Sequence, residues 1–149
     1  MKTARDIMTE DVITIQPNAT IRDLAKNFIE HNISGVPVVD ENGKVLGIAT
    51  ESDLIFHSKR LKVPTVLTIL DSFIFLDSPE KMESELRKIA AASVSDVYTS
   101  PPVTITPDTP LDEIASLMTE KQVHTLPVLD DTGMMIGIVG KKDIIRTIL

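Results

Sequence analysis

The chain reads Gly47-Ile-Ala-Thr-Glu-Ser-Asp53, and ninety residues later it reads Gly137-Ile-Val-Gly-Lys-Lys-Asp143. The glycine, the isoleucine and the aspartate return, whereas the two hydroxyl residues in the middle do not. Apolar residues come directly before and after the first stretch, which predicts a strand that leads into a helix. A chain that keeps the ends of such a stretch and changes its centre indicates one structural unit used twice, with two different surfaces.

The similarity between the two parts of the sequence extends well beyond this stretch. A shift of 90 residues aligns 4–55 with 94–145 without a gap, and 15 of the 52 pairs are identical. The identical pairs are mostly turn formers and core residues, which a repeated fold has to keep. The chain therefore consists of two copies of one unit.

The first part of each copy has the pattern of a strand followed by a helix. Residues 12–15 are rich in β-branched side chains and predict a short strand. Thr20 is a helix cap with Asp23 three residues later, so we expect a helix from Ile21. Its buried stripe is predicted from helical spacing and contains Ile21, Leu24, Ala25, Phe28 and Ile29.

The second part of each copy predicts a hairpin and another helix. Residues 36–39 are expected to form a strand, with Pro37 indicating an edge position or a strand start. The turn Asp40-Glu41-Asn42-Gly43 suits a hairpin, and 44–49 is the return strand. Residues 50–53 then open the second helix, with Thr50 or Ser52 as its cap. The order is β-α-β-β-α, twice, in an α+β (α/β) fold.

Composition excludes several classes of protein. The chain has 149 residues and no cysteine, which rules out disulfides and thiolate metal sites. Its net charge of −7 argues against a nucleic-acid partner, which needs a basic surface. No signal peptide and no apolar stretch long enough to cross a membrane is apparent. We expect a soluble cytoplasmic protein without a membrane partner.

Three segments are predicted. They are a first domain at 1–60, a helical connector at 61–92, and a second domain at 93–149. The connector is too apolar for a free linker. It either packs on the two domains or forms part of a contact between copies of the chain.

The two units resemble the cystathionine-β-synthase-type (CBS) domain, and together they are similar to a stand-alone tandem CBS pair. The motifs that carry this resemblance are Asp6-Ile-Met-Thr9, Ser34-Gly-Val-Pro-Val-Val-Asp40, the run 43–53, and their counterparts 124–130 and 133–143. The resemblance implies two domains packed through their sheets, with ligand clefts between them. It also implies ligands that contain adenosine: AMP, ADP, ATP, S-adenosylmethionine and relatives.

The polar centre of the first stretch suits such a ligand on chemical grounds. A carboxylate such as Asp53 can accept hydrogen bonds from two ribose hydroxyls at once. The hydroxyls of Thr50 and Ser52, with the free N–H groups at the start of a helix, suit a phosphate. The alternative is helix capping alone, because Ser, Thr and Asp are common helix caps.

The second copy departs from this pattern. By analogy with the family Asp143 keeps the ribose contact, but Gly140 and Lys142 replace the hydroxyls. Lys141, Lys142 and Arg146 bring positive charge instead. This cleft either holds a more highly charged phosphate chain or has become purely structural, and the two clefts are not expected to be equivalent.

Further contacts follow from the resemblance, position by position. His124 matches a basic residue near phosphate, the alternative being a surface or capping histidine; its counterpart is Ser34. The base pocket and the apolar walls for a purine are assigned to Ile13, Thr14, Val103, Thr104, Val36, Pro37, Leu126 and Pro127.

The predicted function is a non-catalytic regulatory module that signals by a change of conformation or oligomeric state. The expected partners are an adenosine-containing small molecule, a second copy in a homodimer, and a protein effector. The alternative is a ligand-free scaffold or oligomerisation module that acts through protein or nucleic-acid partners. No catalytic residue, catalytic cofactor or metal site is predicted, because no nucleophile or phosphate-loop motif is present and the histidines at 31, 57 and 124 fall in different settings.

Overall fold

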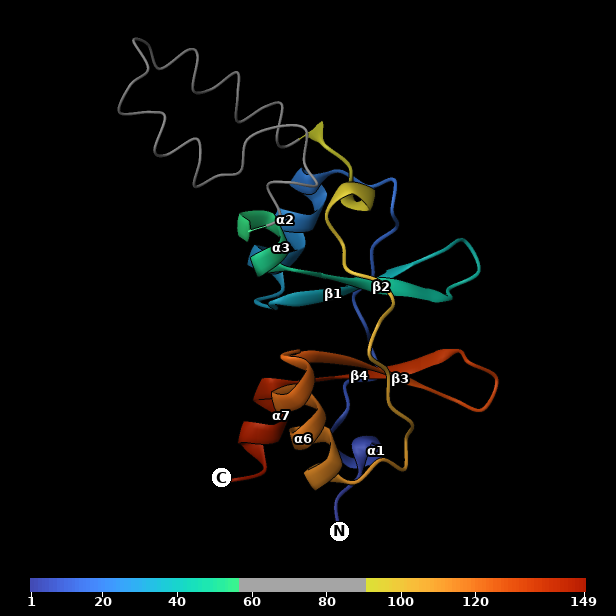
Figure 1. Cartoon of the computed structure of the whole chain (residues 1–149), viewed down its shortest axis with the longest axis vertical. Helices are drawn as coiled ribbons and strands as arrows, with labels where there is room; N and C mark the ends of the chain where they lie inside the picture. The colour runs from blue at the N-terminus through green and yellow to red at the C-terminus, as the bar shows by residue number, and fades with distance from the viewer. Residues whose placement is uncertain (57–90) are drawn as a thin grey trace.

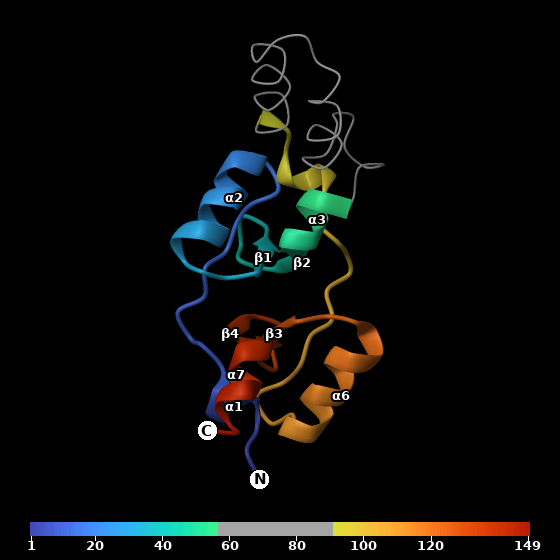
Figure 2. The same cartoon turned by 90° about the vertical axis from the view of Figure 1, so that its left-hand side faces the viewer.

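The computed structural model describes residues 1–56 and 91–149, which form two similar halves stacked through their sheets (Figure 1). Each half has one two-stranded antiparallel sheet, and its longer helices lie on the outer side (Figures 1 and 2). The predicted α+β class and packing through the sheets are confirmed. The predicted connector lies outside the described residues, except for its last two. In chain order the elements are α1 (Ala4–Ile7), α2 (Ile21–Glu30), β1 (Gly35–Val39), β2 (Val45–Thr50), α3 (Glu51–Phe56), η1 (Val94–Asp96), α6 (Leu111–Lys121), β3 (Thr125–Leu129), β4 (Met135–Gly140) and α7 (Lys141–Arg146).

The two hairpins form as predicted. The side chain of Asp40 accepts hydrogen bonds from the backbone N–H groups of Asn42 and Lys44, both at 2.9 Å. Gly43 has a φ of 84°, a conformation that glycine adopts without a steric penalty. Asp130 closes the second hairpin in the same way, and the hydroxyl of Thr132, donating to its carboxylate, lowers the pKa of Asp130.

The predicted strand at 12–15 pairs at one residue only. The N–H of Ile15 donates to the carbonyl of Pro37 at 3.1 Å, and its carbonyl accepts from the N–H of Val39 at 2.9 Å. This parallel bridge lies on the side of β1 away from β2, so Pro37 sits mid-strand with neighbours on both sides. The predicted edge position for Pro37 is therefore wrong. The proline is tolerated because its partner in β2, Ile48, directs both its N–H and its carbonyl to Thr99 instead.

Helix α2 begins where the capping signal places it. The backbone N–H of Asp23 donates to the Thr20 hydroxyl, and the N–H of Thr20 donates to the Asp23 carboxylate, both at 3.1 Å. Ile21, Leu24 and Phe28 are buried as predicted. Ile29 is 82% exposed, contrary to the predicted stripe, because it lies about 100° around the helix from Phe28.

Each copy begins with a lead-in segment, residues 4–15 before α2 and residues 94–105 before α6, and the first parts of these two segments are exchanged between the halves. Ala4 of α1 is fully buried in the core of the second half, and Thr9 pairs with Ile138 in β4. Val94 of η1 is fully buried in the core of the first half, and Thr99 pairs with Ile48 in β2. Each half is thus completed by a segment from the other sequence copy, which the division into 1–60 and 93–149 does not describe.

The halves meet where β1 and β3 approach each other. A Cβ atom built on Gly35 would lie 2.5 Å from the hydroxyl oxygen of Thr125, so the two strands are in close contact. The two lead-in segments pass between the halves on opposite sides of the molecule (Figure 2). Within the part of the chain that the structure describes, no helix has the length and apolar character needed to span a membrane.

Candidate ligand-binding cleft

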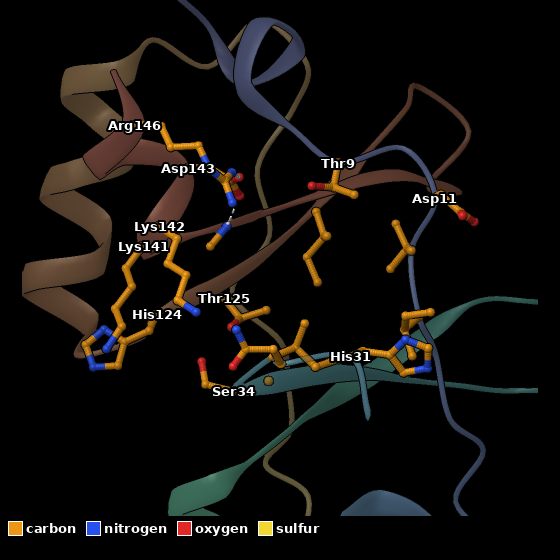
Figure 3. Close-up of a pocket in the computed structure, with 17 residues that line it drawn as sticks. Thr9, Asp11, His31, Ser34, His124, Thr125, Lys141, Lys142, Asp143 and Arg146 are labelled. Atoms are coloured by element: carbon orange, nitrogen blue, oxygen red, sulfur yellow. Dashed lines mark hydrogen bonds and ion pairs between the residues drawn. The ribbon is translucent and has the colours of Figure 1, made fainter. Parts of the chain in front are cut away.

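A cavity of about 350 Å³ lies beside the contact between the halves, within the size range of small-molecule sites (Figure 3). The first sequence copy contributes residues 9, 11–13 and 31–35 to its wall, which are the lead-in segment and the loop between α2 and β1. The second copy contributes residues 124, 125, 138, 140–143 and 146, from the start of β3 and the junction of β4 and α7. A ligand in this cavity would therefore contact both copies.

Asp143 presents an ordered carboxylate to the cavity. One oxygen, Oδ2, accepts from the backbone N–H of Gly140 at 2.7 Å, and Oδ1 accepts from Nη1 of Arg146 at 2.5 Å (Figure 3). The Asp143 side chain is 10% exposed, whereas that of Arg146 is 66% exposed. Each carboxylate oxygen has two lone pairs, so each keeps one acceptor site for a further donor. This geometry suits a pair of neighbouring hydroxyl groups.

Positive charge gathers at one end of the cavity. Lys141, Lys142 and His124 lie together at this end, close to Ser34 and Thr125 (Figure 3). The two lysines and His124 are exposed, and no carboxylate of the described residues lies within salt-bridge distance of either ammonium group. This end of the cavity suits an anion.

The other end is more apolar. Asp11 and His31 lie at the end away from the lysines (Figure 3). Their neighbours in the chain, Val12, Ile13 and Ile33, are half-buried and line the cavity. His31 and His124 therefore line the same cavity, although the sequence places them in different settings. Within residues 1–56 and 91–149, no cluster of three or more His, Cys, Asp or Glu side chains is arranged to hold a metal ion.

In the first copy, Thr50 and Asp53 make the contacts of a helix cap. The backbone N–H of Asp53 donates to the Thr50 hydroxyl at 3.2 Å, and the N–H of Thr50 donates to Oδ2 of Asp53 at 2.8 Å. The hydroxyl of Thr99 donates to Oδ1 at 3.3 Å, and Asp53 is only 3% exposed. Thr50 is the cap and Ser52 is an exposed neighbour. The capping alternative thus has direct contacts, and a ligand role for Asp53 stays a prediction.

Of the other predicted contacts, the cavity includes Ile13, His124, Lys142 and Asp143. The four residues assigned to the purine walls lie in the core instead, because the strands β1 and β3 are covered on both faces. Each of these four is less than 2% exposed: Val36, Pro37, Leu126 and Pro127. Three more predicted residues also lie outside the cavity lining: Thr14, Val103 and Thr104.

Several cavity residues were not predicted. They come from the first copy's lead-in segment and its α2–β1 loop, and include Thr9, Asp11, His31, Asn32 and Ile33. Their side chains form no recognisable motif among themselves. The exchange of segments locates residues 9–13, because Thr9 pairs with Ile138 in β4, whereas residues 31–33 reach the cavity through the contact between the halves.

Comparison with known proteins gives a consistent family. The model of the CBS domain matches the chain twice, at residues 4–60 and 94–149. The uncharacterized protein MJ1426 of Methanocaldococcus jannaschii is 31% identical over 97% of this chain and 90% of its own length. The chloroplastic protein CBSX2 of Arabidopsis thaliana is 29% identical over 99% of this chain, which spans 63% of the CBSX2 sequence.

Solved structures agree. The structure of CBSX2 in complex with AMP is similar, with a TM-score of 0.72, 27% identity, and coverage of 99% of this chain and 97% of that one. The CBS domain pair of protein MJ0100, in complex with 5′-methylthioadenosine and S-adenosyl-L-methionine, has a TM-score of 0.71 and 27% identity, covering 99% and 96%. The chain therefore belongs to the CBS domain family and contains two copies of that domain.

Proposed function

We propose that this chain is a non-catalytic regulatory module that binds an adenosine-containing ligand in the cavity beside Asp143. The observation that carries the proposal is the Asp143 carboxylate, which keeps two acceptor sites between an apolar end and a cationic end of one cavity. In a nucleotide the ribose joins the base to the phosphate, so the base would lie at the apolar end, the ribose at Asp143 and the phosphate at the cationic end. The AMP complex of CBSX2 and the adenosyl complexes of MJ0100 support the ligand class.

Each part of the ligand has a proposed contact. Asp143 accepts from the 2′- and 3′-hydroxyls of the ribose. The base lies against Val12, Ile13 and Ile33, whose half-buried side chains offer an apolar surface. The phosphate lies at the end of the cavity that Lys142 and His124 both line, which accords with the basic role predicted for His124.

Regulation is proposed to act through the arrangement of the halves. Because the cavity wall comes from both sequence copies, a ligand that fills it favours one relative placement of the two sheets. The change in placement would alter the surface of the protein, which a protein effector or a second copy in a homodimer would then recognise. The ligand's differential affinity for the two arrangements sets the size of the effect.

A second site beside Asp53 is a separate proposal. Thr50, Ser52 and Asp53 hold positions equivalent to those of Gly140, Lys142 and Asp143 in the repeat. To bind a ligand there, Asp53 would have to accept hydrogen bonds from ribose hydroxyls. It could do so while it still accepts from the N–H of Thr50, or by giving up the hydrogen bond from the Thr99 hydroxyl. We expect this site to be the weaker one, since Asp53 is 3% exposed.

Calorimetric titration tests the proposal. The protein is unfolded and refolded to remove carried-over ligand, then titrated with adenosine, AMP, ADP, ATP and S-adenosylmethionine. Asp143→Asn keeps the shape of the side chain but removes the charge and one acceptor oxygen. We expect it to weaken binding at least tenfold, equivalent to about 1.4 kcal/mol.

The matched variant is Asp53→Asn, which changes the equivalent helix cap in the first copy. It should leave the tight site unchanged and remove only a weaker second site. Binding that survives in Asp143→Asn but is lost in Asp53→Asn would move the site to the first copy. If no adenosine compound binds the wild-type protein, the ligand-free scaffold becomes the better account.

A further inference from the structure

The two copies carry opposite charge at equivalent positions beside their aspartates. Glu51 and Ser52 in the first copy correspond to Lys141 and Lys142 in the second. The pair therefore changes from a charge of −1 to a charge of +2. The copies align here without a gap, and both lysines of the second copy line the cavity.

The charge at this end of the cavity is positive although the chain is acidic. Lys141, Lys142 and Arg146 contribute +3, and Asp143 contributes −1, which leaves +2 in a chain of net charge −7. Arg146 is bound to Asp143, so the two lysines are the cations left to face a ligand. Salt screens charges beyond about 8 Å, and the ligand therefore responds to these local groups more than to the net charge.

The adenosine-containing ligands differ most in the charge of the group attached to the ribose. A phosphate carries about −1.5 to −2 near neutral pH. Adenosine and 5′-methylthioadenosine are neutral there, whereas S-adenosylmethionine has a net charge of +1, from a sulfonium, an ammonium and a carboxylate. The cationic end of this cavity attracts the first group, is indifferent to the second and repels the third.

We propose that Lys141 and Lys142 are specificity-determining residues that make this cavity select phosphorylated adenosine compounds and reject the sulfonium ligand. This inference rests on the proposed function, because it concerns the same cavity. It goes further in assigning the choice of ligand to two side chains that the first copy lacks. Asp143 binds the ribose, which all these ligands share, and the two lysines contact the group attached to the ribose, in which the ligands differ.

The test compares four probes on one pair of variants. Adenosine, AMP, ATP and S-adenosylmethionine are titrated into the wild type and into Lys141→Glu/Lys142→Ser, which installs the first copy's residues. Both lysines are exposed, so the fold should be retained. In the wild type we expect AMP and ATP to bind about tenfold or more tightly than adenosine, and S-adenosylmethionine to bind more weakly than adenosine.

The variant should lose the preference for phosphate, bind adenosine within about threefold of the wild type, and bind S-adenosylmethionine more tightly than the wild type does. Raising the salt concentration should reduce the phosphate preference in the wild type only. Lys26→Glu/Lys44→Ser makes the same charge change at exposed lysines outside the cavity and should keep the wild-type order of affinities.

The outcomes separate the two proposals. If adenosine and AMP bind equally to the wild type and both are weakened by Asp143→Asn, the charge selection is wrong and the adenosine site stands. If the double variant keeps the wild-type preference, the lysines are not the determinants. If no probe binds the wild type, the proposed function fails, and the selection fails with it.

Discussion

Replacing Gly47 with alanine is expected to destabilise the protein by about 3 kcal/mol, the upper end of the cost of overfilling a packed interior. Gly47 lies in β2 where the lead-in segment of the second copy crosses it. A Cβ atom there would approach the backbone oxygen of Thr99 and the ring of Tyr98 to less than 3.0 Å. The backbone of Thr99 is held by two hydrogen bonds to Ile48, at 2.9 and 3.0 Å, so it cannot move away cheaply.

The same change at Gly137 provides the matched control. A Cβ atom there would meet first the side chain of Met8, with the sulfur at 2.5 Å. Methionine is flexible and can change rotamer, so we expect a loss of only about 1 kcal/mol. Urea denaturation of both variants measures the difference. Equal losses of unfolding free energy would contradict this view of the crossing segments.

Placing a carboxylate at position 4 or position 94 is expected to have the largest effect on stability of any change considered for this chain. Ala4 and Val94 are equivalent in the repeat, and both are 0% exposed. A buried charge without a partner costs about 3–5 kcal/mol. Because the segments are exchanged, Ala4→Asp should loosen the second half, and Val94→Asp should loosen the first half.

Hydrogen exchange resolved by residue distinguishes the halves. Amide protection should fall mainly in β3 and β4 for Ala4→Asp, and mainly in β1 and β2 for Val94→Asp. Where a charged variant does not fold, Val94→Ala gives the same information with a smaller loss of about 2 kcal/mol. Arg5→Asp, at an exposed neighbouring position, is the control and should leave protection unchanged. Loss of protection confined to the half of the same sequence copy would contradict the exchange.

The ends of the repeated stretch are kept for structural reasons, which explains why the sequence predicts so much of the fold. Gly47 and Gly137 both admit a crossing segment. Asp53 and Asp143 both accept from the N–H three residues earlier, at 2.8 and 2.7 Å. Caps, turns and spacing are local signals, and they place α2 and both hairpins correctly.

The exchange of segments and half of the cavity wall are not local. Nothing in residues 4–9 indicates which of two similar sheets they join, since both sheets offer the same groups for pairing. The contact between β1 and β3 is likewise not local, and it is this contact that places His31 and Asp143 on one cavity. Val36 and Pro37 are buried because the neighbours of β1 cover both faces of this strand. The assignment of these residues to a purine wall, made by analogy with the family, did not consider those neighbours.

The centre of the repeated stretch is the part that differs, and it faces the cavity. Lys141 and Lys142 are exposed beside an aspartate that makes the same backbone capping contact in both copies. Such positions change charge at little cost in stability. We propose this as the physical basis for different ligand preferences beside Asp53 and Asp143.

NMR tests directly whether the cavity beside Asp143 is the ligand site. AMP is added to the refolded, ligand-free protein, and the shifts of the backbone amide signals are mapped onto the sequence. We expect shifts concentrated at residues 9–13, 31–35 and 140–146, from both sequence copies at once, at ligand concentrations that saturate the calorimetric signal. Shifts concentrated around residues 50–53 and 99–104, or none at saturating AMP, would contradict the claim that the cavity beside Asp143 is the ligand site.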